Sequence, residues 1–195
     1  MNKLYFITSN KGKYVEAKKK FSDLDIELIQ KNLGYPELQA DSLEDVAIYG
    51  AEDIIKRFDK PFFLEDAGIF IDSLNGFPGV YSAFVFYKIG CSGILKLLEN
   101  TSENNRKACF KSVIAFKEPN RSIKVFYGES HGTISKKHIG SNGFGYDPIF
   151  IPEKETKTFA QMDTFEKNLF SHRGKSLDKL IHYFKNSKIE NFKSI

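Results

Sequence analysis

Tryptophan is absent from this chain, and cysteine and methionine occur only twice each among its 195 residues. The two cysteines, Cys91 and Cys109, are isolated, so they match neither the spacing of a zinc site nor a disulfide framework. No apolar run approaches the roughly 18–20 residues that a membrane-spanning helix needs. The apolar stretch at the N-terminus is too short for a signal peptide and lacks a small-residue cleavage site. We therefore expect no membrane span and a reducing, cytoplasmic setting.

A strong charge imbalance is also missing. The net charge is +4, and the lysines are spread along the chain apart from residues 18–20, a run typical of a solvated helix face. This balance argues against nucleic acid as a partner, and its mild positive bias suits a small polyanionic substrate. Hydrophobic residues make up 41% and charged residues 28%, as in ordinary globular proteins. The length fits one domain, with or without two lobes, and 19 Phe predict a Phe-rich core.

Apolar periodicity predicts alternating strands and helices in the first half of the chain. The clearest helix covers residues 42–58, where apolar residues recur at helical spacing, and Asp41 with Glu44 resembles a capping box at its start. The other predicted elements are a strand over 3–8, a helix over about 12–21, a strand over 25–30 and extended segments over 61–64 and 68–71.

The second half adds a predicted β-hairpin, with strands over 107–117 and 122–128 around Glu118-Pro119-Asn120-Arg121. The remaining predicted elements are a short helix over 91–99, a glycine-rich loop over 140–147, an extended segment over 148–151, a helix beginning near Asp163 and an amphipathic C-terminal helix. Helices and strands that interleave around an inserted hairpin predict an α/β fold with a mixed sheet.

The first candidate functional segment is Thr8-Ser9-Asn10-Lys11-Gly12-Lys13, which follows a predicted strand and opens a predicted helix. Free backbone N–H groups and the helix dipole favour an anion at such a position. Lys13 and the polar side chains add donors. The segment is therefore a candidate phosphate site, although a polar turn between a strand and a helix is common.

Two adjacent carboxylates, Glu65 and Asp66, lie at the end of an apolar strand and precede Ala67-Gly68. Neighbouring residues of a strand point to opposite faces, so one carboxylate can bind a metal while the other serves a nearby turn. Mg²⁺ held by one or two carboxylates and substrate phosphates would offset the cost of placing charge there. A plain surface strand end is the competing interpretation.

Two later segments combine aromatic, glycine and basic residues. In Gly143-Phe144-Gly145-Tyr146-Asp147-Pro148, glycines allow close backbone approach to a flat ligand, and Phe144 or Tyr146 can stack on a base. In Ser171-His172-Arg173-Gly174, His and Arg at a helix start can bind acceptors on a base or phosphate. Each segment alone also fits an ordinary turn or surface.

The order of these motifs resembles the inosine-triphosphate pyrophosphatase family, also called the Ham1-like family. The resemblance spans roughly residues 4–184 and includes Phe-Pro-Gly-Val-Tyr-Ser at 77–82. It implies a single two-lobed domain over residues 1–195, with a long mixed β-sheet flanked by helices and a central nucleotide-binding cleft. It also implies Mg²⁺-dependent cleavage of ITP, dITP or XTP to the monophosphate and pyrophosphate, by an enzyme that is usually a homodimer.

The resemblance further implies roles for single residues. Asp66 matches the general base and metal partner, Glu65 supports it, and Glu37 matches a metal-binding glutamate. The positions implied to bind substrate are Thr8, Ser9, Asn10, Lys11, Gly12, Lys13, Ala67, Phe144, Gly145, Tyr146, Asp147, Lys167, His172 and Arg173. Arg173 carries only donors, so it suits the C6 oxygen of inosine or xanthosine and not the C6 amino group of adenine.

The chain departs from this pattern at two places. Many relatives carry a lysine where this chain has Tyr49 or Gly50, and a basic residue where Ala83-Phe84 stand. Two alternatives also remain open at this point. One is a Maf-like pyrophosphatase acting on pyrimidine or modified nucleotides, and the other is a nucleotide- or RNA-binding module without catalysis.

Overall fold

A computed structural model describes residues 3–36 and 38–192 of the chain. The strands are β1 (Lys3–Ile7), β2 (Glu27–Lys31), β3 (Phe62–Ile71), β4 (Lys107–Lys117), β5 (Lys124–Ile134) and β6 (Phe150–Pro152). The α-helices are α1 (Lys11–Lys20), α2 (Leu43–Ile55), α3 (Ser82–Leu97), α4 (Thr164–Phe170) and α5 (His172–Phe192). Short 3₁₀ helices include η1 (Asp72–Leu74), η2 (Gly79–Tyr81) and η4 (Asp147–Ile149).

The strands form one mixed sheet in the order β2-β1-β3-β4-β5-β6. β1 pairs in parallel with β2 and β3, while β3, β4, β5 and β6 pair with one another antiparallel. The mixed sheet and the β4–β5 hairpin predicted from the sequence are thus confirmed.

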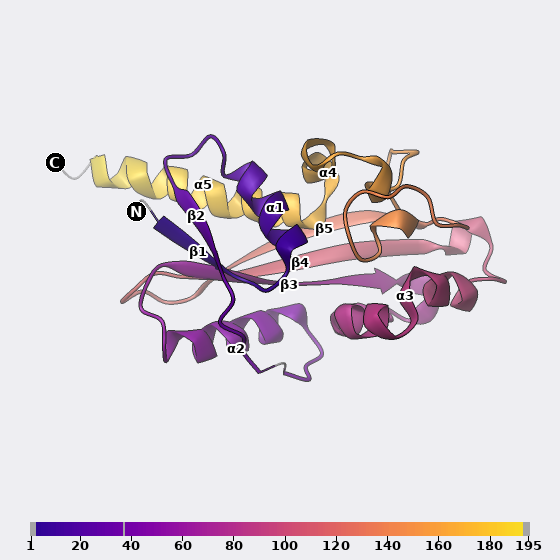
Figure 1. Ribbon diagram of the computed structural model, residues 1–195, viewed down its shortest axis with the longest axis horizontal. Coiled ribbons are helices and arrows are strands. Elements are labelled where there is room, and N and C mark those ends of the chain that lie inside the picture. The colour runs from indigo at the N-terminus through magenta and orange to yellow at the C-terminus, as the bar shows by residue number, and fades with distance from the viewer. Residues whose placement is uncertain (1–2, 37, 193–195) are drawn as a thin grey trace.

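Helices pack on both faces of the sheet (Figure 1). Phe6, Phe63 and Ile114 face α1 and α5 in one hydrophobic cluster. Leu64 and Val113 face α2 in another, on the opposite side. A third cluster forms at the far end of the long strands, where α3 and the segments around β6 pack on Ile69, Ile71 and Phe110. Phenylalanine occurs in all three clusters and is most frequent in the first and third, as the composition predicted.

The edge of β3 changes its neighbour along its length. β1 is in register with β3 only at Tyr5–Phe62 and Phe6–Phe63 among the described residues. β1 then ends at Ile7, and the chain turns into α1. From Leu64 onward, therefore, the backbone of β3 next to the acidic pair is no longer paired with β1, and the start of α1 lies beside it.

Two predictions about helices need correction. The segment expected as a short helix over 91–99 is the second half of α3, which begins at Ser82 and contains a kink at Gly90, with φ 60° and ψ −165°. Exposed aromatics in its first half, such as Phe84 and Tyr87, hide the apolar periodicity. The capping residues of α2 are Ser42 and Asp45, not Asp41 and Glu44, because the Ser42 hydroxyl accepts from the Asp45 N–H.

The segment expected to be extended over 148–151 also differs. Asp147–Ile149 form the 3₁₀ turn η4, and only Phe150–Pro152 join the sheet as β6. Pro148 has no N–H to donate and its φ is fixed, which suits the first turn of a helix better than a ladder position.

By length and composition alone, the segment Gly79–Leu97 could cross a membrane. The segment is not one regular helix, since it starts as η2 and is interrupted at Gly90. Its polar Ser82 is buried, where it accepts from the Ile69 N–H of β3 and donates to Gly79 O. These contacts tie the segment to β3.

Candidate active site

The turn between β1 and α1 is built as an N-terminal helix cap. Asn10 is the N-cap residue, and its Oδ1 accepts from the Lys13 N–H at 3.0 Å. Thr8 Oγ1 accepts from the Asn10 N–H at 3.1 Å. The turn thus fixes the first residues of α1, where free N–H groups favour an anion.

Glu65 and Asp66 point to opposite faces of β3. Glu65 is buried on the α1–α5 face, where its Oε1 accepts from Ser112 Oγ at 2.8 Å. Asp66 lies opposite Val113, which packs on the α2 side, so the half-buried Asp66 belongs to that face. The two carboxylates therefore serve different surroundings, as the strand alternation predicted.

Lys13 connects α1 to the uncovered edge of β3. Its Nζ donates to the backbone carbonyl of Glu65 at 2.9 Å and lies 2.9 Å from Glu65 Oε2. Because this carbonyl belongs to the strand edge that β1 leaves unpaired, Lys13 marks the place where the N-terminal turn and the acidic pair meet.

A chain of buried charges extends from this point. Arg173 at the start of α5 contacts Glu65 Oε1 at 3.1 Å and Glu16 Oε2 at 2.6 Å. Lys167 of α4 contacts the other oxygen of Glu16 at 2.6 Å and Asp147 Oδ2 at 2.5 Å. The side chains of Glu16, Glu65, Asp147, Lys167 and Arg173 are each at most 5% exposed.

Phe144 lies against this network. Lys167 Nζ is 4.8 Å and Arg173 Cζ is 5.4 Å from the centre of its ring. Its backbone N–H donates to Asp147 Oδ2 at 2.8 Å. A Cβ on Gly12 would stand 2.4 Å from the ring, so glycine at this position lets α1 approach Phe144. The predicted phosphate turn and the predicted base loop are therefore in direct contact.

The pKa values of the network follow from burial and charge together. Burial opposes ionisation of Glu65, but Arg173 and Lys13 outweigh it and hold the pKa of Glu65 far below its usual range. Burial also opposes the charge on Arg173, but Glu65 and Glu16 raise its pKa above the usual value. Burial raises the pKa of Asp147 in spite of Lys167.

His172 is buried at the start of α5. Its ring stacks on Phe110, with ring centres 4.6 Å apart and planes within 5°. Burial, followed by the charge of Arg173, lowers the pKa of His172 well below its usual value. Among the described residues, His172 Nδ1 and Arg173 Nε are buried without a hydrogen-bond partner, which is a costly state unless a ligand supplies one.

The structure brings most of the predicted site residues together, but not all. Lys13, Glu65, Phe144, Lys167 and Arg173 converge. Asp66 lies on the other face of β3. Of the predicted positions not yet described, Ser9 and Lys11 are exposed, Ala67 and Gly145 are half-buried, and Glu37 lies outside the described residues.

Tyr146 lies away from this network, in the core at the far end of the sheet. It is 4% exposed, packs edge-on against Phe86 and donates to the Ser82 carbonyl at 3.1 Å. These contacts make Tyr146 part of the support beneath the loop that carries Phe144.

Sequence reasoning missed Glu16, which connects Lys167 and Arg173. Glu16 is 4% exposed on α1. One signal was available: Glu16 lies three residues after Lys13 on one helix, so both side chains share a face. Ser112 and Ser176, which hydrogen-bond to each other at 2.8 Å beside Glu65, carried no such signal.

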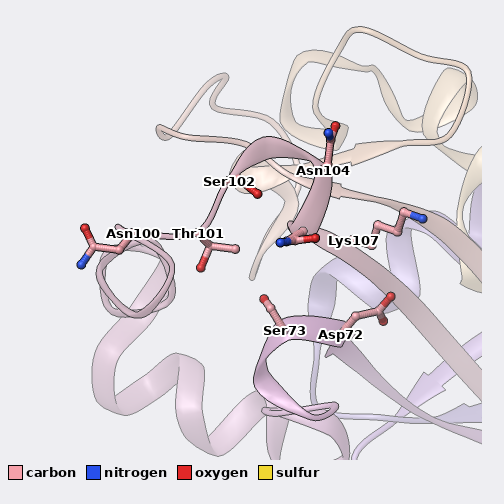
Figure 2. A pocket seen from close by; sticks show the side chains of 8 residues that line it. Asp72, Ser73, Asn100, Thr101, Ser102, Asn104 and Lys107 are labelled. Atoms are coloured by element: carbon pink, nitrogen blue, oxygen red, sulfur yellow. The ribbon is translucent and has the colours of Figure 1, made fainter.

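A separate polar cavity of about 670 Å³ lies at the other end of β3 (Figure 2). Asp72 and Ser73 of η1 face the segment 100–107 across it. Asp72 is six residues beyond Asp66, or about 20 Å along an extended strand. This cavity is therefore remote from the acidic pair.

The buried network predicts a large cost for removing one of its charges. Glu16→Gln should lower the free energy of unfolding by about 3–5 kcal/mol, because two buried cations lose a carboxylate partner. Glu27→Gln is the matched control, since the ion pair of Glu27 with Lys3 is 60% exposed and worth less than about 1 kcal/mol. Urea denaturation of both variants gives the comparison, and equal effects would show that the network contributes little.

The buried His172 predicts a pH dependence of stability. A histidine whose pKa is lowered by folding stabilises the protein fully above its unfolded pKa of about 6.5, and this contribution is lost as the pH falls below that value. His172→Gln should therefore reduce the loss of unfolding free energy between about pH 7.5 and 5.5 by about 1 kcal/mol. The exposed His138→Gln is the control, and an unchanged slope in His172→Gln would contradict the assignment.

Comparison with known proteins gives evidence on the protein's family that does not depend on the site geometry. Residues 4–183 match the family model described as the Ham1 family. The dITP/XTP pyrophosphatase of Thermococcus kodakarensis is 52% identical over 94% of this chain and 97% of its own. The dITP/XTP pyrophosphatase of Methanopyrus kandleri is 50% identical over 95% of this chain and 97% of its own.

Solved structures agree with the sequence relatives. The Staphylococcus aureus Ham1 protein superposes with a TM-score of 0.81 at 31% identity, covering 95% of this chain and 99% of its own. A HAM1 protein from Coxiella burnetii gives a TM-score of 0.80 at 30% identity, covering 95% and 100%. With the motifs, the converging site and these matches in agreement, the chain belongs to the Ham1 family.

Proposed function

We propose that this chain is a nucleoside triphosphate pyrophosphohydrolase that cleaves dITP, ITP or XTP to the monophosphate and pyrophosphate. The observation that carries the proposal is the junction of the α1 start, the β3 edge and the α5 start, where Lys13 and Arg173 both contact Glu65. Relatives named dITP/XTP pyrophosphatase that are 52% and 50% identical over nearly the full length support the same activity.

The triphosphate is assigned to the start of α1. The capped turn from Thr8 to Lys13 presents backbone N–H groups and the positive end of the helix dipole. Lys13 adds an ammonium group beside Glu65. Bound there, the phosphate chain runs past the β3 edge, where Asp66 is the carboxylate on the α2 face.

Asp66 is the proposed general base, taking a proton from the attacking water. A carboxylate donor set suits Mg²⁺, which prefers oxygen ligands, so Asp66 and Glu37 are the residues that would hold this ion. When bound, Mg²⁺ would neutralise part of the negative charge on the phosphates. Glu65 faces the other side of the sheet and supports the site by holding Lys13 and Arg173.

The base is assigned to the region of Phe144, His172 and Arg173. Phe144 offers an aromatic face, and Arg173 Nε is a buried donor that an acceptor on the base can satisfy. A 6-oxo purine supplies that acceptor, whereas the 6-amino group of adenine leaves it unmet. The resulting difference in binding free energy between a 6-oxo purine and adenine is on the order of 1–3 kcal/mol, or about 5–150-fold in specificity.

The proposal predicts a specific loss of turnover. Asp66→Asn should retain nucleotide binding but lose at least about 100-fold in kcat, because the base that deprotonates water is gone. The assay measures pyrophosphate release from eight nucleoside triphosphates with Mg²⁺. Asp72→Asn, at the exposed start of η1 directly after β3, is the matched control.

Three outcomes of this assay would count against the proposal. Unchanged turnover by Asp66→Asn would remove Asp66 from the base role. A preference for pyrimidine nucleotides would favour a Maf-like activity, and binding without any pyrophosphate release would favour a non-catalytic module.

We also infer that the single two-lobed domain acts as a cytoplasmic homodimer. Both cysteines are free, which suits a reducing compartment. The end of η2 and the first half of α3 expose Tyr81, Phe84 and Tyr87 to 46%, 61% and 85%, an apolar surface that a second copy would cover.

This surface can be tested by charge insertion. Tyr87→Glu should shift the protein from dimer to monomer in light scattering after size exclusion, because a carboxylate would be buried in the contact. Phe165→Glu is the control, since Phe165 is 63% exposed on α4. A monomeric wild-type protein, or a dimer that tolerates Tyr87→Glu, would contradict the assignment.

A further inference from the structure

The face of the sheet that carries Asp66 continues along β4 and β5 into a group of potential metal ligands. Cys109 of β4 is directly opposite His131 of β5, and Lys111 is opposite Glu129. Residues opposite one another, or two apart on one strand, share a face, so Cys109, Glu129 and His131 project to the same side. Cys109 is also opposite Phe70, four residues and about 13 Å from Asp66 along β3.

The ligand atoms of these three side chains converge. One atom each from Cys109, Glu129 and His131 lies within 4.8 Å of the other two. His131 Nε2 is 3.5 Å from Glu129 Oε2. Bonds to Zn²⁺ are about 2.0–2.3 Å long, so two ligand atoms bound to one ion lie about as far apart as His131 Nε2 and Glu129 Oε2 do here. Small side-chain rotations would bring the third ligand atom, Cys109 Sγ, equally close.

The surroundings leave room for an ion and its further ligands. Cys109 and His131 line a cavity of about 660 Å³. Cys109 is 7% exposed, whereas the side chains of Glu129 and His131 are 47% and 63% exposed, so one ligand is anchored in the sheet and two can adjust. The charges on the cavity wall balance, because Lys107, Lys111 and Lys154 line it together with Asp72, Glu153 and Glu155.

Lys111 places a positive charge next to Glu129. Its Nζ is 3.5 Å from Glu129 Oε1 and also lies over the ring of Phe70, 5.2 Å from its centre. The second carboxylate oxygen of Glu129, Oε2, is the one that faces His131. Glu129 can therefore keep its contact with Lys111 through one oxygen and offer the second to a cation.

We propose that Cys109, Glu129 and His131 form a binding site for a thiophilic divalent transition metal such as Zn²⁺. Sulfur, imidazole nitrogen and carboxylate oxygen are the ligand types that Zn²⁺ uses, and three protein ligands leave a fourth position for water from the cavity. On binding, a bond forms between Cys109 Sγ and the metal, and the thiol proton passes to solvent. The site is distinct from the carboxylate set at Asp66, which suits Mg²⁺.

Cobalt(II) titration tests the proposal directly. Co²⁺ added to the full chain should produce a near-ultraviolet thiolate-to-cobalt charge-transfer band at one equivalent, and added Zn²⁺ should remove it. Cys109→Ser should abolish the band. Cys91→Ser should keep it, because Cys91 contacts Gly145 O in a different part of the chain, and Asp66→Asn should keep it as well.

A second measurement separates ligation from folding. Glu129→Gln and His131→Gln alter exposed side chains, so both variants should fold, yet each should weaken Zn²⁺ binding at least about tenfold in competition with a chromogenic chelator. His138→Gln is the matched control. The proposal is overturned if the wild-type protein gives no band, if the band persists in Cys109→Ser, or if His131→Gln binds Zn²⁺ like the wild type.

Discussion

The buried ion pairs between Glu16, Glu65 and Arg173 hold the candidate site together. Arg173 lies at the start of α5, Glu16 on α1 and Glu65 on β3, so one guanidinium group fixes the positions of three elements. Each charge is withdrawn from water, and a buried charge is tolerated only when its partner is in place. The arrangement therefore couples the placement of α1, and of the phosphate turn before it, to the placement of the helix that carries His172.

The same network explains how the two ends of a nucleotide can be recognised by one small chain. Lys167 extends the network to Asp147. The carboxylate of Asp147 accepts from the backbone N–H of Phe144 and so orients the loop that carries this ring. Lys13 extends it in the other direction, to the backbone of β3. The proposed base and phosphate regions are thus linked by direct side-chain contacts, and a shift of one would be felt by the other.

Much of this architecture could be predicted from the sequence, because local patterns determine it. The polar turn before α1, the extended segments on both sides of Glu65 and Asp66, and the hairpin of β4 and β5 each had a periodic or motif signal. The structure confirms these elements and joins the two extended segments into the single strand β3. The order of the motifs also pointed to the family, which the comparisons then showed. The roles of single residues remain predictions, and Glu37 lies outside the described residues.

The features that were missed depend on tertiary contacts. The spacing from Lys13 is the one local signal at Glu16, and it does not predict burial, which arises from α4 and α5 about 150 residues away in the chain. The true length of α3 was hidden because its first half exposes aromatics where a helix usually carries polar side chains. The cap of α2 was misplaced by one residue because Ser42 and Asp41 are both good N-cap residues.

The early end of β1 has a consequence for the behaviour of the free protein in solution. An unpaired strand edge is a template for pairing with other chains, and proteins often protect such edges with lysine. Lys13 occupies an acceptor on this edge of β3 when it bonds to the Glu65 carbonyl. The residue that we propose to bind the substrate thus occupies a position that would also discourage edge-to-edge association, so one side chain would serve both solubility and substrate affinity.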